Sequence, residues 1–417
     1  MLIRVFILAI VFILPSFLPT FVKASVVNDI NVGRVTVDLA AADPENEAIT
    51  MAMEQVFIKM SGNKRVSNNL TVQNALENAQ SFLISSSTAR KNDSIILEAR
   101  FNQRSLEAIL KSAGEPLWAN LRPTAVLWLA KESKDGDVKW FSENTDADFH
   151  QTMLDVAFQR GLSVILPLGD LTDATGVTDF DVWTRNIGRL ETHSERYDSP
   201  YIISATLSAL TDNMREVKQE EYQFILQQGA RSEASSQPSS ASIEANQAIN
   251  AQVPDETAHY QVEWIIKGQN HILTGQDFVM NEAQGIYVIL NAYADMLAVK
   301  FASAPELEET EKLETIVLFE NVKSLTDYSA ITELLENMPQ VASASLLQMR
   351  ADLAYFNVML MGSPTDFINV LQIDPRVKDT NRNNNRSVNN SNLLNPSHID
   401  LRAFNQQKVD IHLTWQD

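Results

Sequence analysis

The stretch of residues 124–209 most constrains the fold, because short apolar runs alternate there with segments of helical periodicity. Residues 124–130 (TAVLWLA) and 163–168 (SVILPL) are apolar runs of strand length, and residues 201–210 alternate like a third strand. Strands that alternate with helices are typical of an α/β layer, in which helices keep the faces of the sheet from water. We therefore predict a mixed-sheet α/β sandwich here.

Two helices and a hairpin complete this layer. One helix is expected to begin at Asp146 or Asp148, either of which can cap it, and to end at Gly161, which can adopt the left-handed conformation that stops a helix. Residues 182–196 are predicted to form the second helix. Residues 138–141 return antiparallel to the first strand through a turn at Gly136. The sequence therefore predicts at least four strands in this sheet.

The preceding residues 26–115 are predicted to form a small α+β domain. Its best-defined element is a helix that begins after the capping carboxylate Asp43 and ends at Gly62. Strands are predicted over 32–39 and 94–101. Between and after them we expect a helix over 72–83, a polar loop leading to residue 94, and a short helix over 106–110.

The middle domain is predicted to span residues 120–304. Residues 227–257 consist mainly of Gln, Ser, Ala and Glu, and such a run cannot bury enough apolar surface to offset its ordering entropy. We predict a disordered insert there. A strand is predicted over 260–267, so the insert is expected to be an extended hairpin loop inside the middle domain. A long helix over 281–301 follows.

Residues 314–417 show the order β-α-β-β-α-β, which predicts a ferredoxin-like sandwich. Ser324 and Ser363 are placed to cap its two helices. An Asn-rich run over 379–397 interrupts the domain before the last strand and is predicted to be a second insert. The whole chain is thus expected to be a multi-domain protein of the α+β and α/β classes.

Residues 1–24 carry an early cation, Arg4, an apolar run and small residues before Ser25, which is typical of a secretory signal peptide. An uncleaved membrane anchor is the alternative. No later stretch is long and apolar enough to predict a transmembrane span. A chain without cysteine and with a formal charge of -20 favours a bacterial periplasm and argues against a nucleic-acid partner.

The polar residues do not form a recognisable catalytic, cofactor or metal motif. Six histidines are scattered without metal-ligand spacing, and neither a nucleophile elbow nor a phosphate-binding loop occurs. The acidic stretch 170–181 departs from a calcium loop, so we read it as a solvated loop in which Asp179 or Asp181 caps the next helix, with a calcium site as the alternative. The six tryptophans are predicted to pack rather than to form a sugar platform. Arg122 is expected to make an internal ion pair, with carboxylate binding as the alternative.

Several short motifs are spread over residues 28–305: VFIKMSGN at 56–63, PLW at 116–118, RP at 122–123, LWLA at 127–130, RG at 160–161, LPLGD at 166–170, VW at 182–183 and SERY at 194–197. Together they resemble a proteobacterial exported family known as domain of unknown function 2066. The resemblance implies no established activity. Its motif positions are apolar, aromatic or turn-forming, which suits a structural role. These positions are Ser61, Gly62, Asn63, Trp118, Arg122, Pro123, Trp128, Pro167, Asp170, Trp183 and Tyr197.

The middle domain is also distantly similar to the amino-terminal domain of the translocation protein TolB and to the curli secretion protein. A small domain before such a unit is similar to the flagellar assembly protein T. These resemblances imply assembly and scaffold roles, by analogy of fold alone.

We therefore expect a non-catalytic periplasmic accessory or scaffold protein that binds another cell-envelope component through a domain surface or an exposed sheet edge. No cofactor is predicted. One alternative is an enzyme or binding protein for a cell-wall or polysaccharide fragment, with a groove between the first and middle domains. A periplasmic chaperone that uses the insert is a further alternative.

Overall fold

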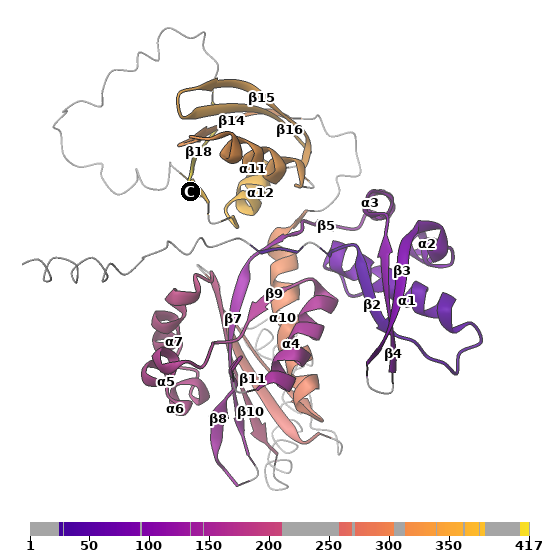
Figure 1. The fold of residues 1–417 in the computed structure, drawn as a ribbon, viewed down its shortest axis with the longest axis vertical. Coiled ribbons are helices and arrows are strands. Elements are labelled where there is room, and N and C mark those ends of the chain that lie inside the picture. The colour runs from indigo at the N-terminus through magenta and orange to yellow at the C-terminus, as the bar shows by residue number, and fades with distance from the viewer. Residues whose placement is uncertain are drawn as a thin grey trace, which may run out of the picture.

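The computed structural model shows three main sheets, of three, six and five strands, each packed with helices (Figure 1). It describes residues 25–27, 29–91, 94–133, 135–144, 146–210, 258–268, 272–303, 313–338, 340–361, 363–374, 376–379 and 409–416. The predicted multi-domain α+β and α/β fold class is confirmed. The predicted signal peptide and the insert over 227–257 lie outside the described residues, as does the Asn-rich insert apart from its first residue.

The small domain is an antiparallel sheet in the order β2-β4-β3, packed with helices. Its core gathers apolar side chains from residue 30 to residue 117. The elements are β2 (Val32–Thr36), α1 (Pro44–Ser61), α2 (Leu70–Leu76), β3 (Leu83–Lys91), β4 (Ser94–Phe101) and α3 (Gln103–Ser112), with 3-10 turns at Val66–Asn68 and Ala79–Phe82.

Helix α1 has the bounds that the sequence predicts. The side chain of Asp43 accepts a hydrogen bond from the Asn46 amide, and Pro44 occupies the first turn, where its missing N–H is not needed. Gly62 ends the helix in the left-handed region with φ 74°. Local capping chemistry therefore defines this helix before any packing is considered.

Two predictions in the small domain are wrong. The helix predicted over 72–83 is split into α2 and a 3-10 turn, and the polar loop after it is the nine-residue strand β3. Every residue of β3 except Leu83 is exposed, so the strand carries no apolar alternation for a sequence pattern to detect. Pairing with β4 alone makes this segment a strand. The strand β2 also ends three residues before the predicted limit.

The middle domain holds a mixed sheet in the order β12-β11-β10-β7-β8, with β9 also paired to β7. β10 and β9 run parallel to β7, whereas β8, β11 and β12 are antiparallel to their neighbours. The strands are β7 (Thr124–Glu132), β8 (Val138–Trp140), β9 (Ser163–Ile165), β10 (Tyr201–Ala209), β11 (Tyr260–Lys267) and β12 (Ile272–Val279).

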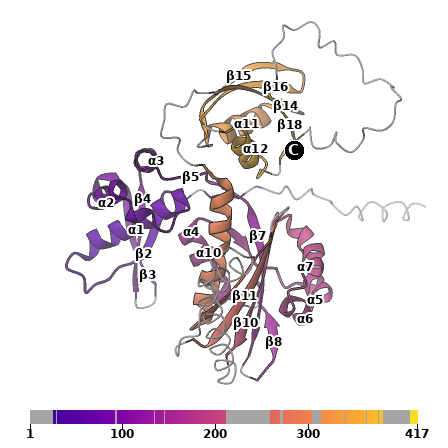
Figure 2. The same ribbon diagram turned by 180° about the vertical axis from the view of Figure 1, so that it is seen from behind.

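Helices cover both faces of this sheet. Figures 1 and 2 show α4 (Ala147–Arg160) and α10 (Glu282–Phe301) on one face and three shorter helices on the other. The shorter helices are α5 (Leu171–Gly176), α6 (Asp179–Trp183) and α7 (Ile187–Ser194), followed by a 3-10 turn at Glu195–Tyr197. The predicted α/β sandwich is present in this arrangement.

The shorter helices correct two predictions. The expected helix over 182–196 is broken, because Arg185 has φ 52° and Asn186 begins a new helix by accepting from the Arg189 amide. The expected loop over 170–181 contains α5, and Thr178 rather than an aspartate caps α6. The strand β12 was not predicted, since its apolar residues do not alternate regularly.

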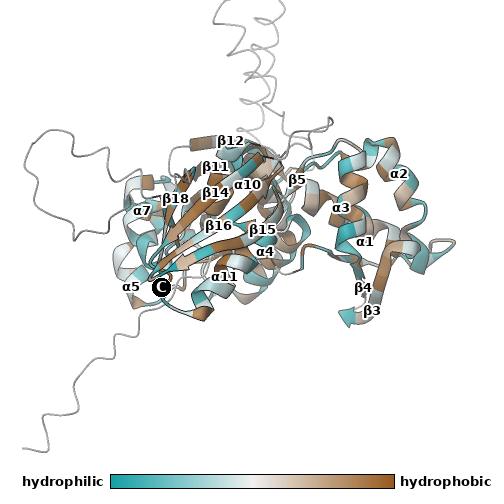
Figure 3. Ribbon diagram, turned by 90° about the horizontal axis from the view of Figure 1, so that it is seen from above, coloured by the Kyte–Doolittle hydropathy of each residue, from teal (hydrophilic) through white to brown (hydrophobic). Residues whose placement is uncertain are grey.

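The C-terminal domain has the predicted element order and one added strand. The elements are β14 (Leu313–Glu320), α11 (Leu325–Glu336), β15 (Val341–Arg350), β16 (Leu353–Leu360), α12 (Pro364–Leu371), β17 (Val377–Asp379) and β18 (Ile411–Trp415). The sheet order is β15-β16-β14-β18-β17 (Figure 3). β18 lies between β14 and β17 and runs parallel to β14. The last strand thus inserts beside the first one.

The segment that links the first two domains is paired on both sides. β5 (Leu117–Trp118) pairs with β13 (Ala302–Ser303), which follows α10, and β6 (Leu121–Arg122) pairs with β1 (Ser25–Val26). Within the described ranges, none of the helices combines the length and apolar character needed to cross a membrane.

Candidate functional site

The Arg122 side chain is fully buried where the small and middle domains meet. Its Nε donates to the Ala119 carbonyl at 2.8 Å, and one Nη donates to the carbonyls of Arg160 and Gly161 at 3.3 and 3.1 Å. The other Nη donates to the Lys59 carbonyl at 2.7 Å. Among the described residues no carboxylate contacts this guanidinium. Both the predicted ion pair and the predicted carboxylate site are therefore replaced by backbone carbonyls.

These carbonyls explain why a cation is buried there. The last carbonyls of a helix have no partner within it and carry partial negative charge. Lys59 lies in the last turn of α1, and Arg160 and Gly161 end α4, so one guanidinium caps two helices from two domains. Burial lowers the pKa of Arg122 well below its usual value, and the neighbouring Arg160 cation acts in the same direction.

Lys59 is a second buried cation at this junction. Its ammonium donates to the Val32 carbonyl at 2.7 Å and lies 3.4 Å from the ring centroid of Phe158 on α4. Burial is the main reason that the pKa of Lys59 falls well below its usual value, and the Arg34 and Arg122 cations lower it further. The Lys59 side chain therefore joins the first sheet to the middle domain.

Arg160 completes a set of three cations, Lys59, Arg122 and Arg160, which we call the domain joint. One Nη of Arg160 donates to the Gly62 carbonyl at 3.2 Å and to the Asp295 carboxylate at 2.9 Å, and the other donates to the Asn291 side chain. α1, α4 and α10 thus meet at one side chain. The predicted groove between the first and middle domains is filled by these contacts at this point.

The first group of motif residues surrounds the domain joint. The Trp118 ring lies 3.3 Å below the guanidinium of Arg122. A Cβ on Gly62 would lie 2.5 Å from Cβ of Ala298, so a side chain at this position would collide with α10. The Ser61 hydroxyl donates to the Phe57 carbonyl at 2.7 Å and holds the end of α1.

Two further motif residues fasten the same region. The Asn63 side chain donates to the Glu115 carboxylate at 2.9 Å, which ties the end of α1 to the segment before β5. The carbonyl of Pro123 accepts from the Tyr293 hydroxyl of α10 at 3.0 Å. Six of the motif positions, from Ser61 to Pro123, therefore lie around one contact between domains.

A second group lies after β9, away from the domain joint. Asp170 caps α5 and accepts two hydrogen bonds from Arg196 at 2.8 and 2.7 Å. These bonds hold the pKa of Asp170 well below its usual value. The Tyr197 hydroxyl donates to buried Asp173 and accepts from the Leu168 amide at 2.9 Å, and burial raises the pKa of Tyr197. This network fixes the loop after β9.

The remaining motif residues pack nearby. The carbonyl of Pro167 accepts from the Glu143 amide at 2.9 Å. The indole N–H of Trp128 donates to the Ser194 hydroxyl at 2.9 Å, and half-buried Trp183 packs in the same cluster under the shorter helices. Trp264 lies on the opposite face of the sheet and Trp415 in the C-terminal domain. Trp128, Trp140 and Trp183 therefore share one packed cluster, and the other three tryptophans pack against other elements.

The chemistry of these groups is that of hydrogen-bonded structural networks. In the part of the chain that the structure describes, no three His, Asp or Glu side chains gather as they would around a metal ion. Each motif side chain described above points to a backbone group or a neighbouring element. Backbone N–H and C=O groups that could bind a partner are found instead at the edge of a sheet.

The strand β3 is the edge strand of the small domain, and residues 84–89 within it are uncharged and lack Pro and Gly. Among the described residues β3 pairs with β4 alone, and one register shift lies at its beginning, between Leu83 and Ser85. In an antiparallel ladder alternate N–H and C=O groups point away from the partner strand, so β3 presents a row of free backbone groups. Ile84 is 60% exposed, which adds an apolar contact at one end.

The other edge strands carry features that hinder pairing with another chain. Side-chain atoms of Gln55 occupy both backbone groups of Arg34 in β2, at 2.7 Å for the amide and 3.1 Å for the carbonyl. β15 is interrupted by two register shifts, and β8 and β17 have three residues each. β12 carries the half-buried charge of Asp277, an inward charge of the kind that protects edges.

Sequence reasoning predicted an exposed edge in general terms but missed β3 itself. A signal was present, since residues 84–89 combine Ile and Thr with serines and lack any turn-forming residue. That pattern also fits a polar loop, and only the pairing with β4 distinguishes the two.

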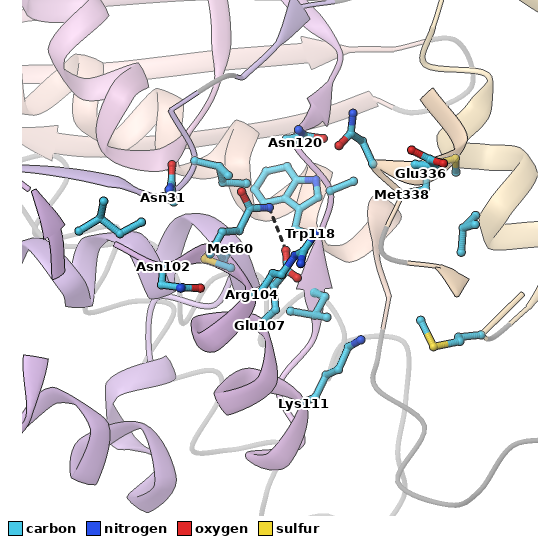
Figure 4. A pocket seen from close by; sticks show the side chains of 18 residues that line it. Asn31, Met60, Asn102, Arg104, Glu107, Lys111, Trp118, Asn120, Glu336 and Met338 are labelled. Atoms are coloured by element: carbon cyan, nitrogen blue, oxygen red, sulfur yellow. Dashed lines mark hydrogen bonds between the residues drawn. The ribbon is translucent and has the colours of Figure 1, made fainter. Parts of the chain in front are cut away.

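A pocket of about 520 Å³ begins at the same end of β3. Ile84 contributes to its wall, together with residues of α3, the linker strand β5 and the end of α11. Figure 4 shows Trp118 in the middle of this wall, between the α3 side chains and those of Glu336 and Met338. The pocket therefore joins the small and C-terminal domains rather than the small and middle domains.

Comparison with known families gives one match. The profile of a domain of unknown function, DUF8605, matches residues 24–119, which span the small domain with β3 and reach Trp118. The match covers less than a quarter of the chain. A search of curated proteins found no match.

Proposed function

We propose that this protein is a non-catalytic accessory or scaffold protein of the cell envelope, which binds a partner protein by strand addition at β3. The observation that carries the proposal is the edge of β3, which is uncharged over residues 84–89 and pairs with β4 alone among the described residues, whereas the other described edge strands are short, irregular, capped by a side chain or carry a half-buried charge. Strand addition recruits a partner through backbone hydrogen bonds and does not need a catalytic side chain.

The domain joint supports this role. A scaffold must hold its binding surface in a fixed position, and three buried cations fasten the small domain to α4 and α10. A partner bound at β3 is thereby held in a defined place relative to the other two sheets. No reaction is required of these groups.

The location is part of the proposal. We propose that residues 1–24 direct export to the periplasm and that the chain is a member of the exported family known as domain of unknown function 2066. The absence of cysteine and the acidic composition support an extracytoplasmic setting, and the motif residues around the domain joint support the relationship.

Crosslinking in the source organism tests the function. A photoreactive residue at Ser87 should crosslink one protein in near-stoichiometric yield, whereas the same residue at Val299, which is 90% exposed on α10, should not. Loss of that product in an edge-blocked chain would support strand addition. Equal, diffuse crosslinking from both positions would contradict it.

Ser86→Pro and Ser87→Pro form a matched pair of blocking variants. Neighbouring residues of a strand point their N–H groups in opposite directions, so one proline removes a ladder bond to β4 and the other removes only an outward donor. The variant that keeps the wild-type unfolding midpoint is the outward one. This folded variant should lose the crosslinked partner.

A further inference from the structure

The pocket at the end of β3 lies where a bound strand would finish. β3 runs from Leu83 to Lys91, and Ile84 at its beginning lines the pocket. A partner strand added antiparallel to β3 runs the other way, so its C-terminal end arrives beside Ile84. The pocket is therefore the first surface that the last residue of such a strand meets.

One wall of the pocket carries two cations. Arg104 and Lys111 are exposed and lie seven residues apart on α3, which places them two turns apart along one face of the helix. Neither makes an ion pair with another residue described in the structure. Glu107 lies between them, and its carboxylate accepts from the Gln103 side chain at 2.9 Å.

The opposite wall is apolar with one acid. Met338, Val341 and Met361 come from the C-terminal domain together with Asn337. Met60 of α1 also lines the pocket, but it lies on the small-domain side, across Trp118 from Met338 (Figure 4). Methionine side chains are flexible and fill irregular gaps, so such a wall accommodates apolar groups of different shape. With Glu107 and Glu336, the two cations of the pocket are balanced by two acids. The lining therefore carries no net formal charge, which disfavours a polyanion, and any attraction for a single carboxylate is local to Arg104 and Lys111.

An unused donor lies in the wall between the two sides. The indole N–H of Trp118 is buried and has no hydrogen-bond partner among the described residues. A buried donor without a partner is unfavourable, and an acceptor on a ligand removes that cost. A peptide terminus supplies such acceptors in its carboxylate and last carbonyl.

We propose that the pocket binds the free C-terminus of the partner strand, with an apolar last side chain against Met338, Val341 and Met361 and the carboxylate near Arg104 and Lys111. This inference rests on the proposed strand addition at β3 and adds to it the chemistry of the partner: an extended chain end with an apolar final residue. Capture of a C-terminal carboxylate together with strand pairing makes recognition specific for a chain end.

A peptide pool tests the inference on the full-length protein. Eight-residue peptides with random positions are prepared once as free acids and once as C-terminal amides, and bound peptides are identified by mass spectrometry. We expect enrichment of apolar last residues in the acid pool. Individual selected peptides should bind about tenfold more tightly as acids than as amides, as loss of a charge-assisted contact implies.

Substitutions assign the effect to the pocket. The double variant Arg104→Gln/Lys111→Gln should remove the preference for the acid, whereas Arg65→Gln, an exposed cation of the same domain outside the pocket, should keep it. Dodecanoate serves as a competitor probe. If dodecanoate displaced the bound peptide as effectively as unlabelled peptide does, the pocket would bind an anionic amphiphile and the inference would be overturned.

The outcomes separate the two proposals. Suppose that free-acid and amide peptides bind equally well and that neither binds to the outward proline variant of β3. This result overturns the terminal-carboxylate inference and leaves strand addition in place. A pool from which the wild-type protein selects no peptide overturns both.

Discussion

The domain joint and the β3 edge use polar groups in opposite ways. At the joint, buried cations meet backbone carbonyls, and Arg122 alone satisfies carbonyls from two helices and the linker. At β3, exposed and uncharged residues leave backbone groups without partners on the outer side. The difference indicates that the joint fixes geometry and the edge is available for binding. Three changes test this contrast, and a fourth tests the network in the loop after β9.

The largest effect is expected at the centre of the joint. Arg122→Met replaces the guanidinium with an apolar side chain of similar length. The buried carbonyls at the ends of both helices then have no donor. We expect the free energy of unfolding to fall by about 3–5 kcal/mol, as when one partner of a buried charged contact is removed. Urea unfolding followed by circular dichroism measures it.

Arg65→Met is the matched control for that variant. Arg65 is exposed on the small domain, so its replacement should change stability by less than about 0.5 kcal/mol. If the two variants unfolded at the same urea concentration, the joint would not fix the domains.

Gly62→Ala should give the next largest effect. The position has φ 74°, and an added Cβ would meet α10 at 2.5 Å, so the backbone and the helix contact must both shift. We expect a loss of about 1–3 kcal/mol in unfolding free energy. Calorimetry of the purified protein measures the change.

Gly188→Ala is the matched control, for which the expected change in unfolding free energy has the opposite sign. This glycine lies within α7, and the nearest atom to its added Cβ is 4.0 Å away. Alanine is the better helix former by about 0.5–1 kcal/mol, so this variant should be as stable as the wild type or more stable. A loss comparable to that of Gly62→Ala would mean that general glycine removal, not the contact with α10, causes the effect.

A smaller, pH-dependent effect is expected at Asp170. Its pKa is depressed in the folded state by Arg196, so its contribution to stability is present above the unfolded pKa and is lost as the pH falls through the folded value. The stability difference between wild type and Asp170→Asn should therefore be largest at pH 7 and shrink below about pH 4. Urea midpoints at pH 7 and pH 3 measure it; a difference that grows in acid would refute the assignment.

The smallest effect on stability is expected on β3 itself. Ser87→Lys places a charge on an edge strand whose side chains are exposed, so unfolding free energy should change by less than about 0.5 kcal/mol. Partner binding should nevertheless weaken, because charges on edge strands oppose pairing. Thermal unfolding and the crosslinking yield, measured on the same preparation, separate the two effects. A destabilised protein would show that β3 is part of the packed core.

Much of the fold could be predicted because local chemistry determined it. The cap at Asp43 and the left-handed Gly62 bound α1, the apolar runs mark β7 and β10, and Ser324 begins α11 with a capping box. The loop after β9 could not be predicted in detail, because the break at Arg185 depends on a hydrogen bond to Thr206 from another strand.

By itself the sequence determined the ends of the well-capped helices α1 and α11 and the position of the apolar strands β7 and β10, since capping and periodicity act within a few residues. Only the tertiary structure decided what Arg122 binds, where β18 inserts and which strand is the open edge. Each of these depends on groups brought together from distant parts of the chain. A serine-rich strand has no periodic signature, and its exposed backbone becomes visible only when its single neighbour, β4, is in place.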